Sequence, residues 1–288
     1  MGDERVGEHA DRGYAERLAT AEVLLAPINR AAVAALELPR GSKGLDAGCG
    51  IGLQSLLLAE AVGEAGRVVG VDLQPGLLAE ARVRAEAAGM SRRVSFEQGN
   101  VQRLPFAAGE FDWAWSANCV GYGIADPEAA VAELARVVRP GGLVALLVWS
   151  SQLLLPGYPL LEARLNATGP GLAPFTPGAP PEWHHLRGLG LLRAAGLHQA
   201  QALTFVGQAF APLAPPVREG LADLLQMRWP GAQSALSSQD AAEFRRLCQP
   251  ESSDFILDHP DYYALYTETL FRGRVGKLER HGRASRSS

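Results

Sequence analysis

The chain has 288 residues, 47% hydrophobic and 20% charged, with a formal net charge of −4 at pH 7. This composition supplies a sizeable core and excludes global disorder. The acidic balance argues against a dedicated nucleic-acid-binding protein, which would carry a strong basic footprint. Between residues 272 and 288, six Lys or Arg stand against one Glu. We expect this basic tail to be solvated, with an anionic partner as the alternative.

The cysteines and the N-terminus indicate in which cellular compartment the protein is expected. Cys49, Cys119 and Cys248 are odd in number and widely spaced, which predicts neither a disulfide framework nor a metal site. The N-terminus is charged from its third residue and has no apolar signal core. No apolar run approaches the length of a membrane span. We therefore expect a cytoplasmic protein without a membrane span.

Helices and strands are predicted to alternate through the first 150 residues. Helix-forming residues fill residues 14–38, before a break at Pro39–Gly41. In the following segments, short apolar or β-rich runs predict strands and longer runs predict helices. In chain order they are a strand over 43–48, a helix over 53–62, a strand over 67–73, a helix over 75–88, strands over 94–100 and 111–118, a helix to residue 138, a turn over 139–142 and a strand over 143–150. This alternation predicts an α/β fold, with a mostly parallel sheet covered on both faces.

The second half of the chain is less regular. Residues 151–182 are rich in Pro and Gly, and a long irregular segment inside a compact domain is often a lid or a binding element. A helix is predicted from Pro181 to a stop at Gly196. A sixth strand is predicted over 198–205, helices over 215–250 and a last strand over 262–274.

The most informative stretch is GLDAGCGIG, residues 44–52, between the first predicted strand and a helix. A glycine turn in that place lets a ligand approach the backbone and the N–H groups of the helix N-terminus. Its glycines, at 48, 50 and 52, do not have the G-x-G-x-x-G spacing of dinucleotide sites. Asp72 ends the second strand, where a carboxylate can accept hydrogen bonds from both ribose hydroxyls. Asn100 follows the third strand and can bond an adenine edge.

Taken in order, five segments resemble the class I S-adenosylmethionine-dependent methyltransferases: LDAGCGIG, VVGVDL, GNVQRLPF, FDWAWSAN and LARVVRPGGLVALL. The most similar group contains small-molecule enzymes of ubiquinone and menaquinone biosynthesis. The resemblance covers residues 40–150 well and the later elements more weakly. It implies S-adenosylmethionine as the cofactor. It also implies a Rossmann-like fold with a mostly parallel seven-stranded sheet, helices on both faces, and a cap of helical and loop insertions.

The resemblance implies which residues bind the cofactor. The methionine part would be held by Asp46 and the backbone of residues 47–50, with Asn118 near it. Asp72 would bind the ribose, and the other residues would surround the adenine; Asp is common in the family where Asn100 stands, and an amide can bond similarly. The full set is Asp46, Ala47, Gly48, Cys49, Gly50, Asp72, Leu73, Asn100, Val101 and Asn118.

The same interpretation predicts how the chain is divided into segments. They are an N-terminal helical cover (1–40), a cofactor-binding core (41–150), a Pro/Gly-rich lid (151–182), a continuation of the core (183–210), a helical substrate cap (211–260), a final strand (261–275) and the basic tail (276–288).

The acceptor pocket is expected in the irregular parts. Their aromatic residues Tyr122, Tyr158 and Trp183 can either wall a hydrophobic or ring-bearing small molecule or simply pack the insertions. His184 and His185 begin the helix predicted after the lid, and either can act as a base at neutral pH. Because adjacent helical positions face different ways, at most one is expected to point inward. A structural or surface role for both is the alternative.

We therefore expect an enzyme that moves a methyl group to a small acceptor by in-line displacement, with a base only where the acceptor must lose a proton. Neither nucleic acid nor a membrane is an expected partner, and an oligomer is left open. Three alternatives stand beside this reading. They are a same-fold enzyme with other chemistry such as cyclisation, a non-catalytic cofactor-binding module, and an NAD-dependent dehydrogenase, against which the glycine spacing counts. The acceptor and the methylated atom are not identified.

Overall fold

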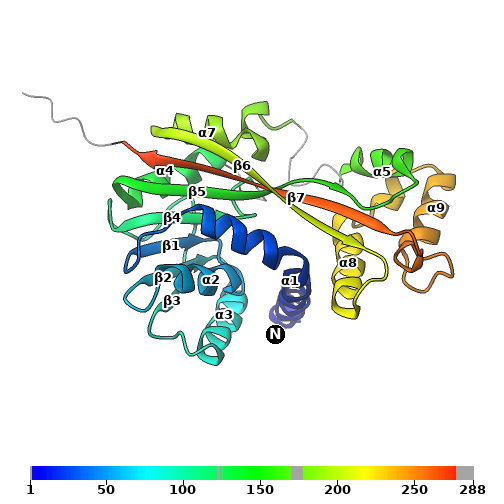
Figure 1. Ribbon diagram of the computed structural model, residues 1–288, viewed down its shortest axis with the longest axis horizontal. Helices are drawn as coiled ribbons and strands as arrows, with labels where there is room; N and C mark the ends of the chain where they lie inside the picture. Colours follow the sequence, from blue (N-terminus) through cyan, green and yellow to red (C-terminus); the bar gives the residue numbers. More distant parts are fainter. Residues whose placement is uncertain (1, 122–123, 125, 170–177, 277–288) are drawn as a thin grey trace, which may run out of the picture.

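The computed structural model describes residues 2–121, 124, 126–169 and 178–276, with side chains from Gly13 onward. Seven strands form one sheet in the order β3-β2-β1-β4-β5-β7-β6 (Figure 1). Neighbouring strands among β1 to β5 pair in parallel, and β7 is antiparallel to both β5 and β6. The predicted mostly parallel seven-stranded α/β fold is confirmed.

The bounds of the elements agree with most of the predicted ranges in the first half. The strands are β1 (Lys43–Ala47), β2 (Arg67–Asp72), β3 (Val94–Gln98), β4 (Phe111–Ala117), β5 (Val138–Leu153), β6 (Leu197–Phe210) and β7 (Tyr263–Val275). The α-helices are α1 (Gly2–Ala35), α2 (Leu53–Val62), α3 (Pro75–Ala87), α4 (Pro127–Val137), α5 (Pro159–Asn166), α7 (Gly188–Ala194), α8 (Pro215–Arg228) and α9 (Ser238–Cys248). The short 3-10 turns are η1 (Pro181–Trp183), η2 (His185–Arg187), η3 (Ala232–Ala235) and η4 (Ile256–Asp258).

Local chemistry fixes several of these ends. Helix α4 begins at Pro127, and the Asp126 side chain before it accepts a hydrogen bond from the Ala129 N–H at 2.9 Å. This pair is a favourable helix start, since the carboxylate satisfies an N–H that has no helical partner. Helix α2 ends at Val62, and the following Gly63 donates its N–H to the Ala59 and Glu60 carbonyls at 3.2 Å while its φ of +77°, which glycine adopts readily, turns the chain away.

Helices cover both faces of the sheet core. Helices α4 and α7 bury their apolar residues on one face, while α2, α3 and the C-terminal part of α1 cover the other (Figure 1). A third apolar cluster lies at the far end of the sheet, where α5, α8 and α9 pack around Trp229 and Tyr262. We call this region, residues 154–169 and 211–262, the cap.

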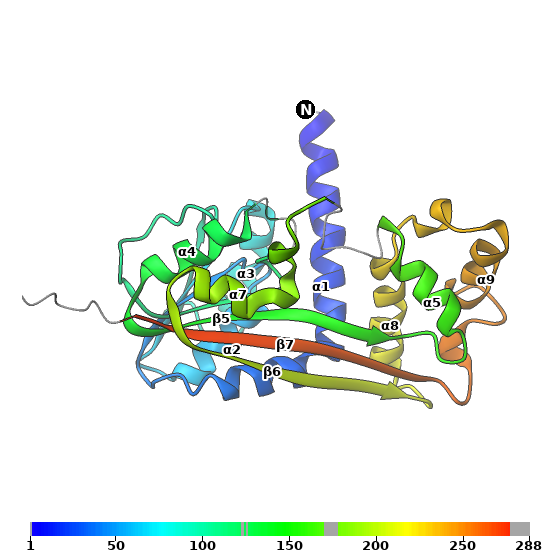
Figure 2. The same cartoon turned by 90° about the horizontal axis from the view of Figure 1, so that it is seen from above.

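The strands β5, β6 and β7 continue beyond the core and carry the cap on a long three-stranded arm (Figures 1 and 2). Residues 151–153, predicted as the start of the lid, are therefore strand. The turn predicted at 139–142 lies inside the bounds of β5 as an irregularity, because Phe111 pairs with Val138 whereas Trp113 pairs with Leu143. Residues 139–142 therefore have no pairing partner in β4 and bulge out of the β4–β5 pair.

Helix α1 connects the core to the cap. Its Leu24 and Ile28 belong to the apolar cluster of the cap, and its Ala32 and Val33 belong to that of the core. Residues Gly13–Ala35 are long and apolar enough to cross a membrane by length and composition, contrary to our prediction that no run has that length. Core helices pass the same test, and this segment packs against α2, α3, α8 and β6.

Candidate cofactor site

The glycine turn is pinned to the end of β2. The N–H groups of Gly48 and Cys49 both donate to the Val71 carbonyl, at 2.7 and 3.0 Å. Gly48 has a φ of +78°, and a Cβ at this position would lie 2.3 Å from the Cys119 Sγ. Only glycine fits this position without strain, since both its backbone conformation and its lack of a side chain are needed.

Asp72 links the turn to the end of β2. Its Oδ2 accepts the Gly50 N–H at 2.9 Å, and its Oδ1 accepts the Gln74 N–H at 3.0 Å. Each carboxylate oxygen has a second lone pair, so the group can still accept hydroxyl donors. The neighbouring Leu73 leaves 58% of its surface exposed, which provides an apolar face beside this carboxylate.

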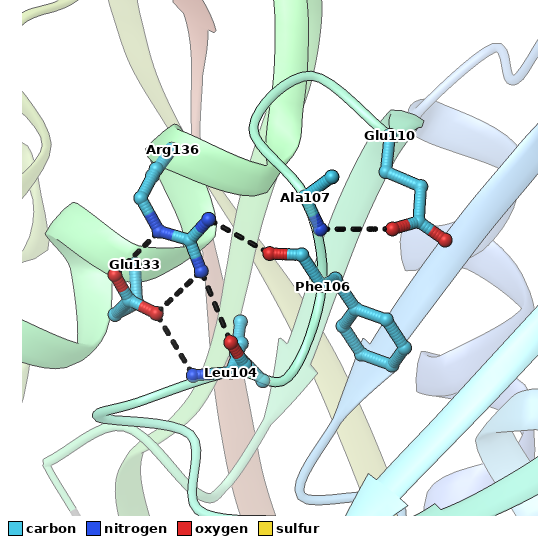
Figure 3. A network of polar contacts seen from close by, with 6 residues as sticks. All are labelled: Leu104, Phe106, Ala107, Glu110, Glu133 and Arg136. Carbon is cyan, nitrogen blue, oxygen red and sulfur yellow. Dashed lines mark hydrogen bonds and ion pairs between the residues drawn. The ribbon is translucent and has the colours of Figure 1, made fainter.

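The loop after β3 carries Asn100 and Val101. Asn100 is exposed and its Oδ1 accepts the Gln102 N–H at 2.9 Å, while Val101 is buried. Farther along, Arg136 of α4 donates to the Phe106 and Leu104 carbonyls at 2.8 and 3.1 Å (Figure 3).

Glu133 completes this support of the loop. It pairs with Arg136 at 2.7 Å and accepts the Leu104 N–H at 2.8 Å, so side chain and backbone are tied together (Figure 3). Nearby, Glu110 accepts the Ala107 N–H at 3.0 Å. A rigid base of this kind fixes the backbone from which Asn100 projects.

These strand ends surround one cavity of about 470 Å³. Eight of the ten predicted cofactor residues line it: Gly48, Cys49, Gly50, Asp72, Leu73, Asn100, Val101 and Asn118. The strands β1, β2, β3 and β4 thus meet at their carboxyl ends, which is where open α/β sheets bind ligands.

The two other predicted residues lie beneath the turn and not in the cavity lining. Asp46 is 1% exposed, and its Oδ2 accepts the Ser55 hydroxyl at 2.5 Å. Burial raises its pKa to about 7. Ala47 is fully buried, and its carbonyl accepts the Ser116 hydroxyl at 2.9 Å. Asp46 therefore supports α2 under the turn, and its expected role of holding the methionine part, through water or directly, remains a prediction.

Asn118 lines the cavity, but its amide is turned away to other partners. Its Nδ2 donates to Glu268 of β7 at 2.6 Å, and its Oδ1 accepts the Trp149 N–H at 2.8 Å. Its φ of +47° is left-handed, a conformation that Asn tolerates better than most residues. The amide thus locks the end of β4 to β5 and β7, and the residue presents mainly its backbone to a ligand.

Of the two predicted histidines, His184 lies between the turns η1 and η2, and His185 begins η2. The helix predicted from Pro181 to Gly196 is therefore wrong over its first part. The two imidazoles stack at 4.3 Å and neither lines the cofactor cavity, and the expectation that at most one points inward stays a prediction. His185 packs against Gly121 in the loop after β4, and burial lowers its pKa to about 4. An imidazole with such a pKa is neutral but weakly basic at pH 7. A catalytic role for either histidine stays a prediction.

Of the three predicted aromatic residues, the two that the structure describes, Tyr158 and Trp183, do not line the cofactor cavity. Tyr158 lines a separate cavity of about 660 Å³ in the cap, where its hydroxyl accepts a hydrogen bond from Arg246 at 3.2 Å. Trp183 is half-buried in η1. Tyr122 lies outside the described residues, as do parts of the predicted lid and basic tail, so their roles remain predictions.

Sequence reasoning missed one whole wall of the cavity, which helix α1 supplies. The side chains of one helical face line it: Tyr14, Leu18, Ala21, Glu22, Leu25 and Asn29. These positions recur at helical spacing, and the face is apolar apart from Tyr14, Glu22 and Asn29. The three polar residues within this otherwise apolar face were the signal that the sequence offered. A helical face that only packs in a core would be apolar throughout.

The residues present fit a nucleoside that carries an amino-acid tail. Asp72 and the exposed Leu73 suit a ribose and an adenine, and the left-handed glycines leave room for a ligand at the backbone. The buried Oε1 of Gln54 also lines the cavity and has no hydrogen-bond partner, so it can accept a donor from the ligand. Among the described residues, no group of three or more His, Cys, Asp or Glu can hold a metal ion.

Fold and site define the core as a class I, S-adenosylmethionine-dependent methyltransferase domain. The family model described as "Methyltransferase domain" matches residues 45–142. The predicted family, fold and cofactor are confirmed. The matched region includes the glycine turn, Asp72 and Asn100, but neither α1 nor β7.

Relatives and solved structures agree with this class. A demethylmenaquinone methyltransferase of Bacillus cereus is 36% identical over 115 residues, which are 39% of this chain and 46% of that protein. The chain thus matches under half the length of this relative. Among solved structures, YcgJ of Bacillus subtilis has a TM-score of 0.51 at 17% identity, covering 85% of this chain and 98% of its own. A phosphoethanolamine N-methyltransferase of Haemonchus contortus has a TM-score of 0.53 at 16% identity, covering 87% of this chain and 53% of its own. At these identities the two structures show the fold.

Proposed function

We propose that the protein transfers the methyl group of S-adenosylmethionine to a small hydrophobic or ring-bearing acceptor. One observation carries this proposal: the cofactor cavity opens between the glycine turn and the apolar face of α1, which also packs on the cap. A methyl acceptor must approach the sulfonium from the side opposite the leaving group, and an apolar wall there favours an apolar molecule.

The donor supplies an activated methyl group on a good leaving group, so the protein has mainly to position two molecules. Asp72 orients the nucleoside, and the pinned turn of Gly48 and Cys49 fixes the site for its tail. Asn118, held at 2.6 Å by Glu268, keeps the end of β4 in place. Correct placement of reactants contributes several kcal/mol to such a reaction.

The position of the cap is consistent with a methyl acceptor that extends beyond the cofactor cavity. The cap lies on the three-stranded arm, beyond the carboxyl ends of the parallel strands. Helix α1 lies between the cap and the sheet core (Figure 2). Elements at that edge can close over an acceptor and exclude water from it. The relative named demethylmenaquinone methyltransferase is consistent with a ring-bearing acceptor, although its match covers 39% of this chain.

Calorimetry tests the proposal directly. We expect binding of S-adenosylmethionine and of its demethylated product, and none of NAD. Asp72→Ala should weaken both, because it removes the ribose acceptor and the anchor of the Gly50 N–H. Glu97→Ala, an exposed strand position outside the cavity, is the matched control and should leave the affinity unchanged. Binding of NAD without either sulfur compound would refute the proposal and favour the dehydrogenase.

A further inference from the structure

Among the residues of α1 whose side chains the structure describes, Glu22 is the one carboxylate in the lining of the cofactor cavity. Among the described lining residues the other carboxylate is Asp72, which already accepts the Gly50 and Gln74 N–H groups. Glu22 is half-buried, and its Oε2 accepts the Asn29 Nδ2 donor at 3.3 Å. This bond holds one oxygen and leaves the other oxygen, Oε1, to act on a ligand.

The position of Glu22 places it on the acceptor side. The glycine turn and the ends of β2 and β3 take the opposite walls of the same cavity, and α1 stands between core and cap (Figure 2). On the same helical face, Leu18, Ala21 and Leu25 provide an apolar surface around the carboxylate. An acceptor molecule that rests on this surface brings its reacting atom near the Glu22 carboxylate, which can take its proton.

We propose, resting on the function proposed above, that Glu22 is the general base of the reaction and that the acceptor is a phenol or an enol. In this step the acceptor oxygen forms a bond to the methyl carbon while the carbon–sulfur bond of the donor breaks. The electron pair of that bond goes to sulfur, and the hydroxyl proton goes to the Glu22 carboxylate. The products are a methyl ether, the neutral thioether and a protonated Glu22, which returns its proton to water.

The electrostatics around Glu22 suit a base better than a permanent counter-ion. Burial raises its pKa from the ordinary range, whereas Asn29 and the exposed Arg30 oppose the shift. Tyr14 and Asp72 share its cavity, and the buried Glu268 of β7 lies close enough to interact with its charge. A carboxyl whose pKa is shifted toward neutral is better matched to a weakly acidic hydroxyl. A site for an ammonium acceptor would instead be expected to keep its carboxylate firmly ionised.

The test uses Glu22→Gln, which keeps an acceptor for Asn29 but removes the base. Glu16→Gln, an exposed position on the same helix outside the cavity, is the control. Methyl transfer from labelled S-adenosylmethionine is measured with catechol, 4-nitrophenol and 1,4-dihydroxynaphthalene, and with benzylamine and phenethylamine as matched amines. Calorimetry with S-adenosylhomocysteine reports cofactor binding separately.

We expect the wild type to methylate at least one hydroxyl probe and Glu22→Gln to lower kcat by about 10²-fold or more, the range of general-base catalysis. Cofactor affinity should be unchanged, and the deficit should shrink as the pH approaches the pKa of the probe, since an ionised probe needs no base. An equal loss of S-adenosylhomocysteine affinity would make Glu22 a cofactor ligand and overturn the inference. So would methylation of the amines alone, or of no probe, by protein that binds the cofactor. Wild-type protein that binds neither sulfur compound would instead refute the proposed function itself.

Discussion

The glycine turn gives the sharpest prediction, because two glycines with nearly equal backbone angles differ in their surroundings. Gly48 has a φ of +78° and Gly141 a φ of +80°. A Cβ at Gly48 would meet the Cys119 Sγ at 2.3 Å and its Cβ at 2.5 Å, whereas a Cβ at Gly141 would meet nothing within 4 Å. Alanine at the two positions therefore separates the effect of backbone conformation from that of close packing.

The expected magnitudes follow from these distances. The left-handed conformation costs an alanine roughly 1–2 kcal/mol at either position. At Gly48 the clash with Cys119 adds a further overpacking cost of about 1–3 kcal/mol. Because Cys119 lines the cofactor cavity, its displacement should also intrude on the ligand. A loss of about 1.4 kcal/mol in binding is a tenfold loss of affinity, so we expect at least that for Gly48→Ala.

Urea denaturation followed by circular dichroism measures the stability of both variants, and calorimetry measures their affinity for S-adenosylhomocysteine. Gly141→Ala should lower stability only by the cost of the backbone conformation. Its affinity for the ligand should be unchanged, since Gly141 lies near the start of β5, at the edge of the sheet opposite to the cavity. If Gly48→Ala were no less stable than Gly141→Ala and bound the ligand equally well, the steric account of the turn would be refuted.

Three further predictions concern the rest of the site. Arg136→Lys should weaken cofactor binding several-fold without unfolding the core, because a lysine cannot bond the Phe106 and Leu104 carbonyls and Glu133 together; calorimetry beside a thermal melt checks this. Leu73→Ala should lower affinity by about 1 kcal/mol and leave stability unchanged, as the side chain is 58% exposed until a ligand covers it. Burial raises the pKa of Glu268 from 4.5 to about 7, so the folded state holds this proton more tightly and stability from this group falls as the pH rises between these values. Glu268→Gln should remove this dependence, worth about 3 kcal/mol, whereas an unchanged slope of stability against pH would show that Glu268 is not the group responsible.

The core could be predicted from the sequence because each element there is specified locally. Strands β1 to β4 have five to seven residues, helices α3 and α4 each begin at a proline, and a glycine follows α2, so the hydrophobic period and the start and stop residues agree. The carboxyl ends of parallel strands lie at the same edge of the sheet, whatever the length or structure of the segments that connect the strands. The places of Asp72 and Asn100 in the cavity followed from this geometry, whereas Leu73 and Val101 were added by the resemblance to the methyltransferases.

The other parts of the site depend on contacts between distant segments, which periodicity does not reveal. The partner of Asn118 lies 150 residues away on β7, and so its amide could not be assigned from its own surroundings. The face of α1 that lines the cavity has the same spacing as a core face. The helix predicted from Pro181 was wrong because a Pro-started segment was extended through His184, whose ψ of 129° is extended.

The place of β7 in the sheet also bears on how the protein assembles. This strand follows all the others in the chain, yet it lies between β5 and β6, which make no pairing with each other. During synthesis, β6 therefore has no place in the sheet until residues 263–275 have emerged from the ribosome. The same strand brings Glu268 to Asn118. The emergence of β7 and the anchoring of Asn118 at the wall of the cofactor cavity are thus one event, so a chain that stops short of β7 should fold its parallel core without acquiring a complete cavity wall.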